Sequence, residues 1–321
     1  MSNKIFVKDI VVDEGRILNE IFLVRNTDIR EGNNGRKHFY MTLSDVTGDI
    51  QAVKWSLNPS EVTAYSRIKI GDIIDIRFTC KEWMGKKQLT VSNIVHPVTS
   101  EINKADFFKA APEKPGEMYA YILDKINSFQ DEDLQKICKY FYEVNKDRLM
   151  YYPAARSNHH AEYAGLLYHV KRMMMTAERV CEVYTKLNKE LLMAGVALHD
   201  IEKLNEIQSD ENGVSDDYSL EGKMLGHLVM GVWSIGDVSE KLGINKEKAL
   251  MLQHMSLSHH YEPEFGSPIR PLFPEAEMLH YLDIMDAKMF DMEQALNYVK
   301  PGEFTDKVFT LDNRKLYQKN F

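Results

Sequence analysis

A histidine followed directly by an aspartate, His199-Asp200, is the feature of this sequence with the clearest chemical meaning. The pair offers one nitrogen donor and one oxygen donor from adjacent backbone positions, a mixture that divalent ions such as Mn, Fe and Zn accept. It ends an apolar run from Leu191 to Leu198, which predicts a buried helix. Buried ionisable groups are costly unless they are paired or bind a metal. We therefore expect a metal site at the end of this helix.

Further donors lie beside the buried faces of other predicted helices. His169 borders the apolar stripe of a helix predicted over residues 160–184, and Asp283 lies in a helical stretch at 279–288. Three converging helices would bring these donors to the His-Asp pair. A first ion would then be held by His169, His199, Asp200 and Asp283. For any one histidine taken alone, the alternative is an ordinary residue of the core.

Three more histidines could hold a second ion next to the first. They are His227, His259 and His260. Two neighbouring ions suit phosphodiester hydrolysis, because they share the negative charge that develops on the phosphate.

The first hundred residues have the alternating pattern of short strands. Strand-like runs cover residues 17–25, 38–43, 49–55, 72–78 and 87–91, with a helical stretch at 59–67. Five strands with a helix between the third and fourth is the order of an OB-fold barrel. From Pro115 onward, apolar residues recur three or four positions apart, as they do in helices. We predict an all-β OB-fold barrel (1–96), a linker (97–115), an all-α bundle (116–300) and a C-terminal tail (301–321).

Aromatic and basic side chains gather on the predicted barrel. In proteins that bind single strands, aromatic rings stack on bases and cations contact phosphates. The alternative is that about half of these aromatic residues fill the barrel, because alternation along a strand sends some side chains inward. The candidates are Phe39, Tyr40, Trp55, Trp83, Arg36, Lys37, Lys54, Lys86 and Lys87.

The composition is that of a globular protein. The net charge is −8, with +2 in residues 1–100 and −10 in the remainder, which is compatible with a nucleic-acid module at the N-terminus. No run of eighteen apolar residues and no signal-peptide core occurs, so we expect no membrane span. The three cysteines are far apart and odd in number, which favours reduced thiols and a cytoplasmic protein.

The order of these motifs resembles that of the HD-domain metal phosphohydrolases, in which a lone His, a His-Asp pair and a distant Asp lie on helices. A closer likeness rests on six segments: Asn158–Ala161, Gly165–His169, His199–Ile201, Glu221–His227, Leu257–His260 and Pro274–Asp283. Together they are similar to the YhaM-type 3′→5′ exoribonucleases of Gram-positive bacteria. The likeness extends from about residue 10 to 300.

The resemblance implies that the barrel precedes an HD domain, and that the enzyme removes nucleotides from the 3′ end of single-stranded RNA, and often DNA. It implies Mn as the metal and two ions, with the ligand sets given above and Asp200 central to catalysis. Mg, Fe, Co, Ni or Zn also suit a His/Asp shell.

Two further residues match positions of the family. Lys203 follows the His-Asp pair and could neutralise a phosphate oxygen; the alternative is a solvated lysine near a helix end. His160 matches a histidine at the mouth of the site, where it could bind substrate or donate a proton to the leaving oxygen. A structural role is the alternative for His160.

One position departs from the family pattern, because Glu202 stands where the family has glycine. A carboxylate there could point into solvent, repel an RNA phosphate or bind an ion, and the loss of glycine excludes backbone angles that only glycine reaches cheaply. This position leaves open an RNA-binding or regulatory protein with weakened catalysis. A phosphohydrolase of small nucleotides also stays open, since HD sites share one chemistry across many substrates. The preference between RNA and DNA and any homo-oligomer also stay open.

Overall fold

The computed structural model describes residues 4–32, 35–98, 102–156, 160–297 and 299–321. It divides the chain into two compact units, Met1–Lys109 and Ala110–Phe321. Asn158 and His159 of the family-like segments, and residues 99–101 of the predicted linker, lie outside the described residues. None of the described helices combines the length and the apolar character that crossing a membrane requires.

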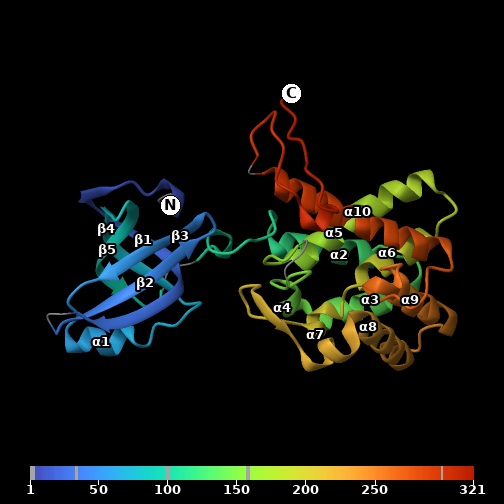
Figure 1. The fold of residues 1–321 in the computed structure, drawn as a ribbon. Helices are drawn as coiled ribbons and strands as arrows, with labels where there is room; N and C mark the ends of the chain where they lie inside the picture. Colours follow the sequence, from blue (N-terminus) through green and yellow to red (C-terminus); the bar gives the residue numbers. More distant parts are fainter. Residues whose placement is uncertain (1–3, 33–34, 99–101, 157–159, 298) are drawn as a thin grey trace. The chain divides into compact units, whose positions relative to one another are not determined.

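The first unit is a closed five-stranded barrel, which confirms the predicted OB fold (Figure 1). Its strands follow the order β1-β2-β3-β5-β4, and every pair is antiparallel except β3 and β5. The elements are β1 (Asp13–Glu31), β2 (Lys37–Asp45), β3 (Gly48–Lys54), α1 (Pro59–Tyr65), β4 (Ile73–Trp83) and β5 (Lys86–Val95). As predicted, the helix lies between the third and fourth strands.

Local sequence explains where helix α1 begins and how strands β4 and β5 are joined. Asn58 caps α1 by accepting a hydrogen bond from the backbone N–H of Glu61, and Pro59 occupies the first turn, where its missing N–H costs nothing. Between β4 and β5, Met84 and Gly85 both have positive φ, as a tight two-residue hairpin turn requires. Inside, the rings of Phe22 and Phe78 meet edge to face.

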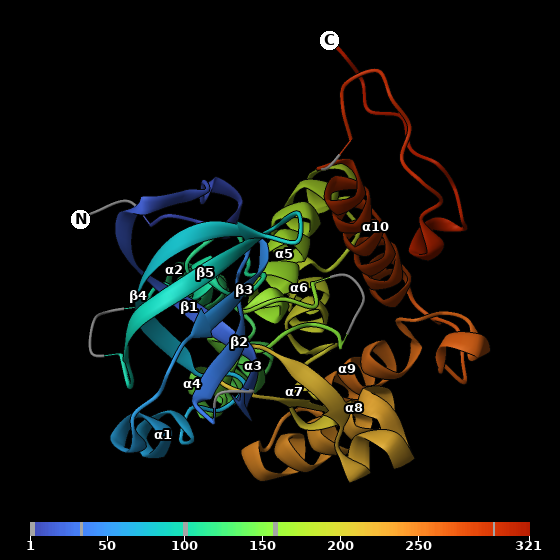
Figure 2. The same ribbon diagram turned by 60° about the vertical axis from the view of Figure 1, so that its left-hand side comes forward.

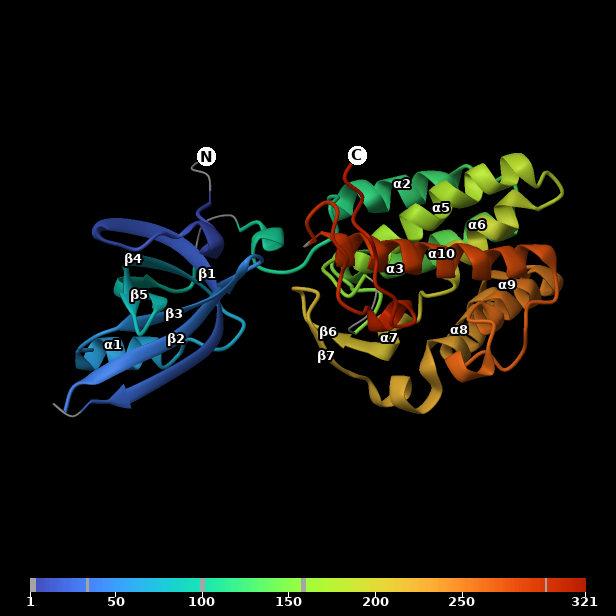
Figure 3. The ribbon, with the colours of Figure 1, turned by 45° about the horizontal axis from the view of Figure 1, so that its top comes forward.

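The second unit is a helical bundle built around helix α6, which is buried from Leu191 to Leu198 (Figures 1 and 3). Helix α6 contacts α3, α5, α9 and α10, which surround it. The helices are α2 (Pro115–Asn127), α3 (Glu132–Val144), α4 (Lys146–Leu149), α5 (Gly165–Val183), α6 (Lys189–Leu198), α7 (Lys203–Glu206), α8 (Leu220–Leu242), α9 (Lys246–Ser258) and α10 (Pro274–Leu296). The expected bundle is confirmed, and it also carries a short hairpin, β6 (Ile207–Ser209) and β7 (Ser215–Tyr218).

Helix α5 begins at Gly165, five residues later than the pattern predicts. His160 and Ala164 have positive φ, which breaks a helix before that point. A Cβ atom on Gly165 would lie 2.1 Å from the carbonyl oxygen of His160, so the absent side chain lets the preceding loop fold back on the helix. This loop carries His160 into the bundle.

The segments that precede and follow the helical bundle in the sequence also contain buried residues. In the stretch predicted as a linker, Phe107 and Phe108 are buried in a cluster with Leu23 of the barrel. In the C-terminal tail, Leu311 is fully buried, and the short 3-10 turn that contains it contacts α10 (Figure 2).

Candidate metal centre and nucleic-acid interface

Helix α6 delivers the His-Asp pair to the interior, as the sequence predicts. Every residue from Leu191 to Leu198 is buried, and His199 forms the C-cap of the helix. Asp200 follows with only 2% of its surface exposed. A carboxylate at this depth requires compensating partners.

The two oxygens of Asp200 face two different pairs of imidazoles. Oδ2 lies 3.3 Å from Nε2 of His199 and 3.9 Å from Nε2 of His169. Oδ1 lies 3.4 Å from Nε2 of His227 and 3.7 Å from Nε2 of His259. The structure therefore brings together four of the predicted ligands around one central carboxylate.

Two of these four imidazoles, those of His199 and His259, are oriented by backbone carbonyls; we call them the inner pair. Nδ1 of His199 lies 2.9 Å from the oxygen of Val196, and Nδ1 of His259 lies 2.9 Å from the oxygen of Ser256. A carbonyl only accepts, so each Nδ1 donates and each Nε2 of the neutral ring presents a lone pair. Those lone pairs point toward oxygens of Asp200, which also only accept.

The other two imidazoles, those of His169 and His227, are oriented by carboxylates instead; we call them the outer pair. Nδ1 of His169 lies 2.8 Å from Oδ2 of Asp286, and Nδ1 of His227 lies 3.0 Å from Oε2 of Glu206. The ring of His227 therefore also turns Nε2 toward Asp200, and that of His169 turns Nε2 toward both Asp200 and Asp283, 3.3 Å from Oδ1 of Asp283. Sequence reasoning missed Asp286 and Glu206, because an acidic residue on a helix is usually solvated.

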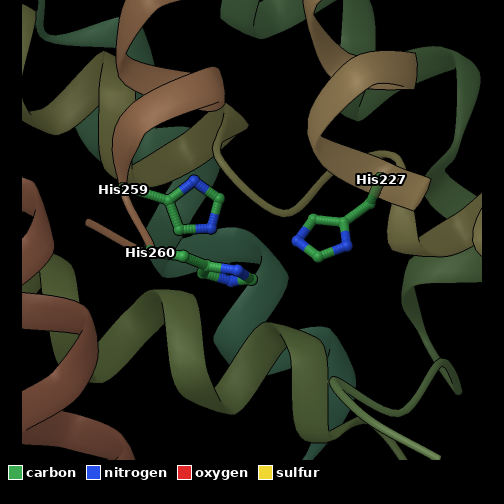
Figure 4. Close-up of side chains that lie close together, drawn as sticks. All are labelled: His227, His259 and His260. Atoms are coloured by element: carbon green, nitrogen blue, oxygen red, sulfur yellow. The ribbon is translucent and has the colours of Figure 1, made fainter. Parts of the chain in front are cut away.

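Several triads of donors lie close enough to hold an ion, and all predicted ligands belong to at least one. Three of the four triads among the described residues consist of predicted ligands alone, each with ligand atoms within 4.8 Å of one another: His169, His199 and Asp200; His199, His259 and Asp283; and His227, His259 and His260. Figure 4 shows His259 and His260 converging with His227, which comes from α8.

Burial keeps two of these imidazoles in the neutral form, which can bind a metal ion. It lowers the pKa of His227 and of His259, which leaves them neutral near pH 7. The neutral ring is the form that binds a metal.

Charge pairs dominate at the carboxylates. Burial opposes ionisation of Asp200, but neighbouring positive charge, including the ammonium group of Lys203, outweighs it and holds the pKa of Asp200 well below its usual range. Burial also favours neutral His169, yet its hydrogen bonds to Asp283 and Asp286 raise the pKa of His169 to about 9. The centre is therefore arranged around ionised carboxylates.

A divalent cation fits this arrangement. Within the described residues, Nε2 of His199, His227 and His259 and Oδ1 of Asp200 are buried without a hydrogen-bond partner. Each such atom costs about 1–3 kcal/mol, and a cation among them would satisfy several at once. The donor set, imidazole nitrogens with carboxylate oxygens, suits Mn, Fe or Zn.

The structure excludes the alternative given for Lys203 and places His160 away from where it was expected. Lys203 is buried, and its Nζ lies 2.7 Å from Oδ2 of Asp200, so it is not a solvated lysine. His160 is fully buried against Phe290, and its Nε2 lies 2.8 Å from Oδ2 of Asp286. The expectation that His160 stands at the mouth of the site is wrong, because the loop before Gly165 carries it inward.

Glu202 has ordinary helical angles, φ −78° and ψ −4°, so its backbone requires no glycine. Its Oε2 accepts a hydrogen bond of 2.7 Å from the side chain of Asn205. Among the described residues, the donor triads do not include Glu202. Its carboxylate is therefore held away from the ligand sets by a neighbouring amide.

The barrel separates the predicted binding residues into two groups. Phe39 is 1% exposed and stacks on Tyr65 inside the barrel, so its prediction as a binding residue is wrong. Strand alternation places it inward and its neighbour Tyr40 outward. Lys54 is paired with Glu61, and Lys87 reaches the carbonyl of Ile10. Arg36, Lys37 and Lys86 are exposed.

Three outward aromatic residues and two cations form a continuous surface. Trp55 and Trp83 are 39% and 57% exposed, and the Trp55 ring meets that of Tyr40 at 6.0 Å. Lys81 lies over both tryptophans, and Arg30 lies over Tyr40. We call these residues the aromatic surface. Lys81 and Arg30 were missed because only the barrel's register brings them beside the rings.

Family models match both units. An OB-fold nucleic-acid-binding domain matches residues 22–96, and an HD domain matches residues 166–288. The chain is 38% identical over 312 residues to "3′-5′ exoribonuclease YhaM" of Geobacillus sp. (strain WCH70). The aligned residues cover 96% of this chain and 93% of that relative. It is 36% identical over 318 residues to the protein of the same name from Bacillus subtilis (strain 168), covering 98% and 99%.

Replacing Glu202 with glycine tests whether this residue impairs the centre. We expect Glu202→Gly to leave Mn²⁺ binding and RNA hydrolysis unchanged, because its carboxylate is held by Asn205. The free energy of unfolding should fall by about 0.5–1 kcal/mol, the cost of a more flexible backbone. Mn²⁺ titration, hydrolysis assays and urea unfolding followed by circular dichroism measure these quantities. A large gain in hydrolysis would show instead that Glu202 repels the substrate.

Proposed function

Because this chain belongs to the YhaM family of 3′-5′ exoribonucleases, we propose that it shortens single-stranded RNA from the 3′ end in a metal-dependent reaction. The observation that carries this proposal is the convergence of four imidazoles on the two oxygens of Asp200. Water adds to the phosphorus of the terminal phosphodiester, and the bond to the 3′ oxygen of the preceding nucleotide breaks. The product is a 5′-nucleotide.

We assign two ions to the centre. His169, His199 and Asp283, with Oδ2 of Asp200, would hold the first; His227, His259 and His260, with Oδ1, would hold the second. Such ions supply Lewis acidity toward the phosphate and lower the pKa of an attacking water. We favour Mn²⁺ among the ions that this shell accepts.

Lys203 has two tasks in this proposal. Its ammonium group stabilises the ionised carboxylate of Asp200. That carboxylate in turn raises the pKa of Lys203, despite the opposing effect of burial. It also brings a positive charge to the edge of the centre, where a non-bridging phosphate oxygen would gain stabilisation as negative charge develops. No side chain needs to attack the phosphate.

The barrel binds the strand in this proposal. The aromatic surface offers Tyr40, Trp55 and Trp83 for stacking, and Arg30 and Lys81 for phosphates. A mononucleotide would not need such a surface, so we favour a polynucleotide substrate over a small nucleotide. Stacking and phosphate contacts tolerate both sugars, so we extend the proposal to single-stranded DNA. The three free thiols fit a reducing compartment, the cytoplasm.

Replacing Asp200 with alanine separates catalysis from binding. The Asp200→Ala variant should lose at least about 10²–10³-fold in hydrolysis, since a central electrostatic group is removed. Its affinity for RNA should stay near that of the original protein, because the aromatic surface is untouched. End-labelled RNA in the presence of Mn²⁺ reports both, as a 3′-shortening ladder and as a binding curve. Asp237→Ala, at a surface ion pair with Lys241, is the matched control, and an unchanged ladder from Asp200→Ala would refute the site assignment.

Removing either exposed tryptophan tests the aromatic surface. Trp55→Ala and Trp83→Ala should each weaken binding of single-stranded RNA by about 1–3 kcal/mol, the contribution of a stacked base. Binding of Mn²⁺ should not change. Fluorescence anisotropy of labelled RNA measures the affinity, and Ile70→Ala, at another exposed apolar residue of the barrel unit, is the control. RNA affinity equal to that of the control in both tryptophan variants would exclude this surface.

A further inference from the structure

The two outer imidazoles of the centre differ from the inner two in what holds them. Carboxylates orient His169 and His227, whereas backbone carbonyls orient His199 and His259. We propose that Asp286 and Glu206 are positioning residues, each of which sets the affinity of one of two metal ions independently of the other. This inference rests on the two-ion centre of the proposed function and adds residues that lie outside its ligand sets.

Asp286 is held by donors on both of its oxygens. Oδ2 lies 2.8 Å from Nδ1 of His169 and 2.8 Å from Nε2 of His160, and Oδ1 accepts from Nε of Arg172 at 2.6 Å. Asp286 is also 93% buried, since its exposed fraction is 7%. Its position is therefore fixed by three side chains from outside α10, and it in turn fixes the plane of the His169 ring.

The cluster of His160, His169 and Asp286 also has the spacing of a cation site. The occupancy of its oxygens argues against that use, because Oδ1 of Asp286 accepts from Arg172 and Oδ2 faces two imidazole nitrogens. Oδ1 of Asp200, in contrast, is buried without a hydrogen-bond partner among the described residues. We therefore assign the cluster as a clamp on His169, with His160 as part of the clamp and not as a proton donor.

Glu206 holds His227 by two atoms at once. Oε1 accepts from the backbone N–H of His227 at 3.0 Å, and Oε2 lies 3.0 Å from Nδ1 of the same residue. The helix is kinked directly before this point, where Gly226 has φ 70° and ψ 158°. A Cβ atom on Gly222 would lie 2.4 Å from the carbonyl oxygen of Glu206, so this glycine allows the close approach of α8 to α7.

The two clamps share no residue. Asp286 and His169 belong to α10 and α5, and Glu206 and His227 belong to α7 and α8. They also act on opposite sides of Asp200, because His169 faces Oδ2 and His227 faces Oδ1. A change in one clamp should therefore reach one ion and leave the other.

A carboxamide in place of either carboxylate would disturb its clamp. Asparagine at position 286 would accept on one atom only and would turn an N–H₂ group toward a donor. Partners that hold the second nitrogen of a metal-binding histidine typically contribute about 10–100-fold to metal affinity. We expect losses of that size from Asp286→Asn and from Glu206→Gln.

Equilibrium binding of Mn²⁺ to the full chain, followed by the electron paramagnetic resonance signal of free Mn²⁺, tests this directly. Asp286→Asn should weaken one of two sites by about 10–100-fold and leave the other unchanged, and Glu206→Gln should do the same to the other site. In a His227→Ala background, where the first site alone remains, Asp286→Asn should still weaken binding and Glu206→Gln should not.

Matched controls exist on the same segments. Glu293→Gln removes the other carboxylate that Arg172 contacts, and Glu202→Gln removes a carboxylate four positions before Glu206. Both should bind Mn²⁺ like the original protein. The proposal is overturned if Asp286→Asn or Glu206→Gln also binds like the original protein, or if either one weakens both sites equally.

Two safeguards keep the result interpretable. If Asp286→Asn does not fold, Arg172→Lys replaces it, since that variant alters the Oδ1 contact from a less buried position and should weaken the same site. Mn²⁺ binding is measured without RNA, so it does not depend on hydrolysis. If the variants lose Mn²⁺ affinity at one site each but the original protein does not shorten RNA, the proposed function alone is refuted. If the original protein shortens RNA and the variants lose no Mn²⁺ affinity, this inference alone is refuted.

Discussion

The centre depends on one constraint, the burial of the Asp200 carboxylate between imidazole nitrogens that face both of its oxygens. Asp200 is 2% exposed, and imidazole nitrogens lie 3.3–3.9 Å from its oxygens. Oδ2 is paired with Lys203, but Oδ1 and the Nε2 atoms of three of these histidines are buried without a hydrogen-bond partner among the described residues. Such an arrangement is unfavourable unless a cation lies between these atoms. The need for a cation is therefore built into the packed core, which explains why the most buried helix of the bundle ends at this position.

The surrounding helices serve that constraint from several directions. Helix α6 supplies His199 and Asp200, and α5, α8, the end of α9 and α10 each bring a donor toward them. Close approach is needed for this, and glycines provide it where loops and helices meet. Gly165 lets the loop with His160 fold back, and Gly222 lets α8 reach α7.

Sequence patterns could predict the features that arise from local periodicity. The apolar run before His199 requires a buried helix, and the series of short alternating strands with a helix between the third and fourth indicates the OB barrel. Patterns could not choose which face of β2 lies inward, so Phe39 was misplaced. They also could not find Asp286 or Glu206, because each is identified only by a histidine far away in sequence. The start of α5 was missed for a similar reason, since the positive φ of Ala164 follows from tertiary packing.

The positions of bound metal ions decide whether Asp200 lies between two cations. Anomalous scattering from crystals of the full chain grown with Mn²⁺ would locate the ions without reference to activity. We expect two peaks that flank the Asp200 carboxylate, one beside His169 and His199 and the other beside His227 and His259. A peak confined to the cluster of His160 and Asp286, or the absence of density next to Asp200, would contradict it.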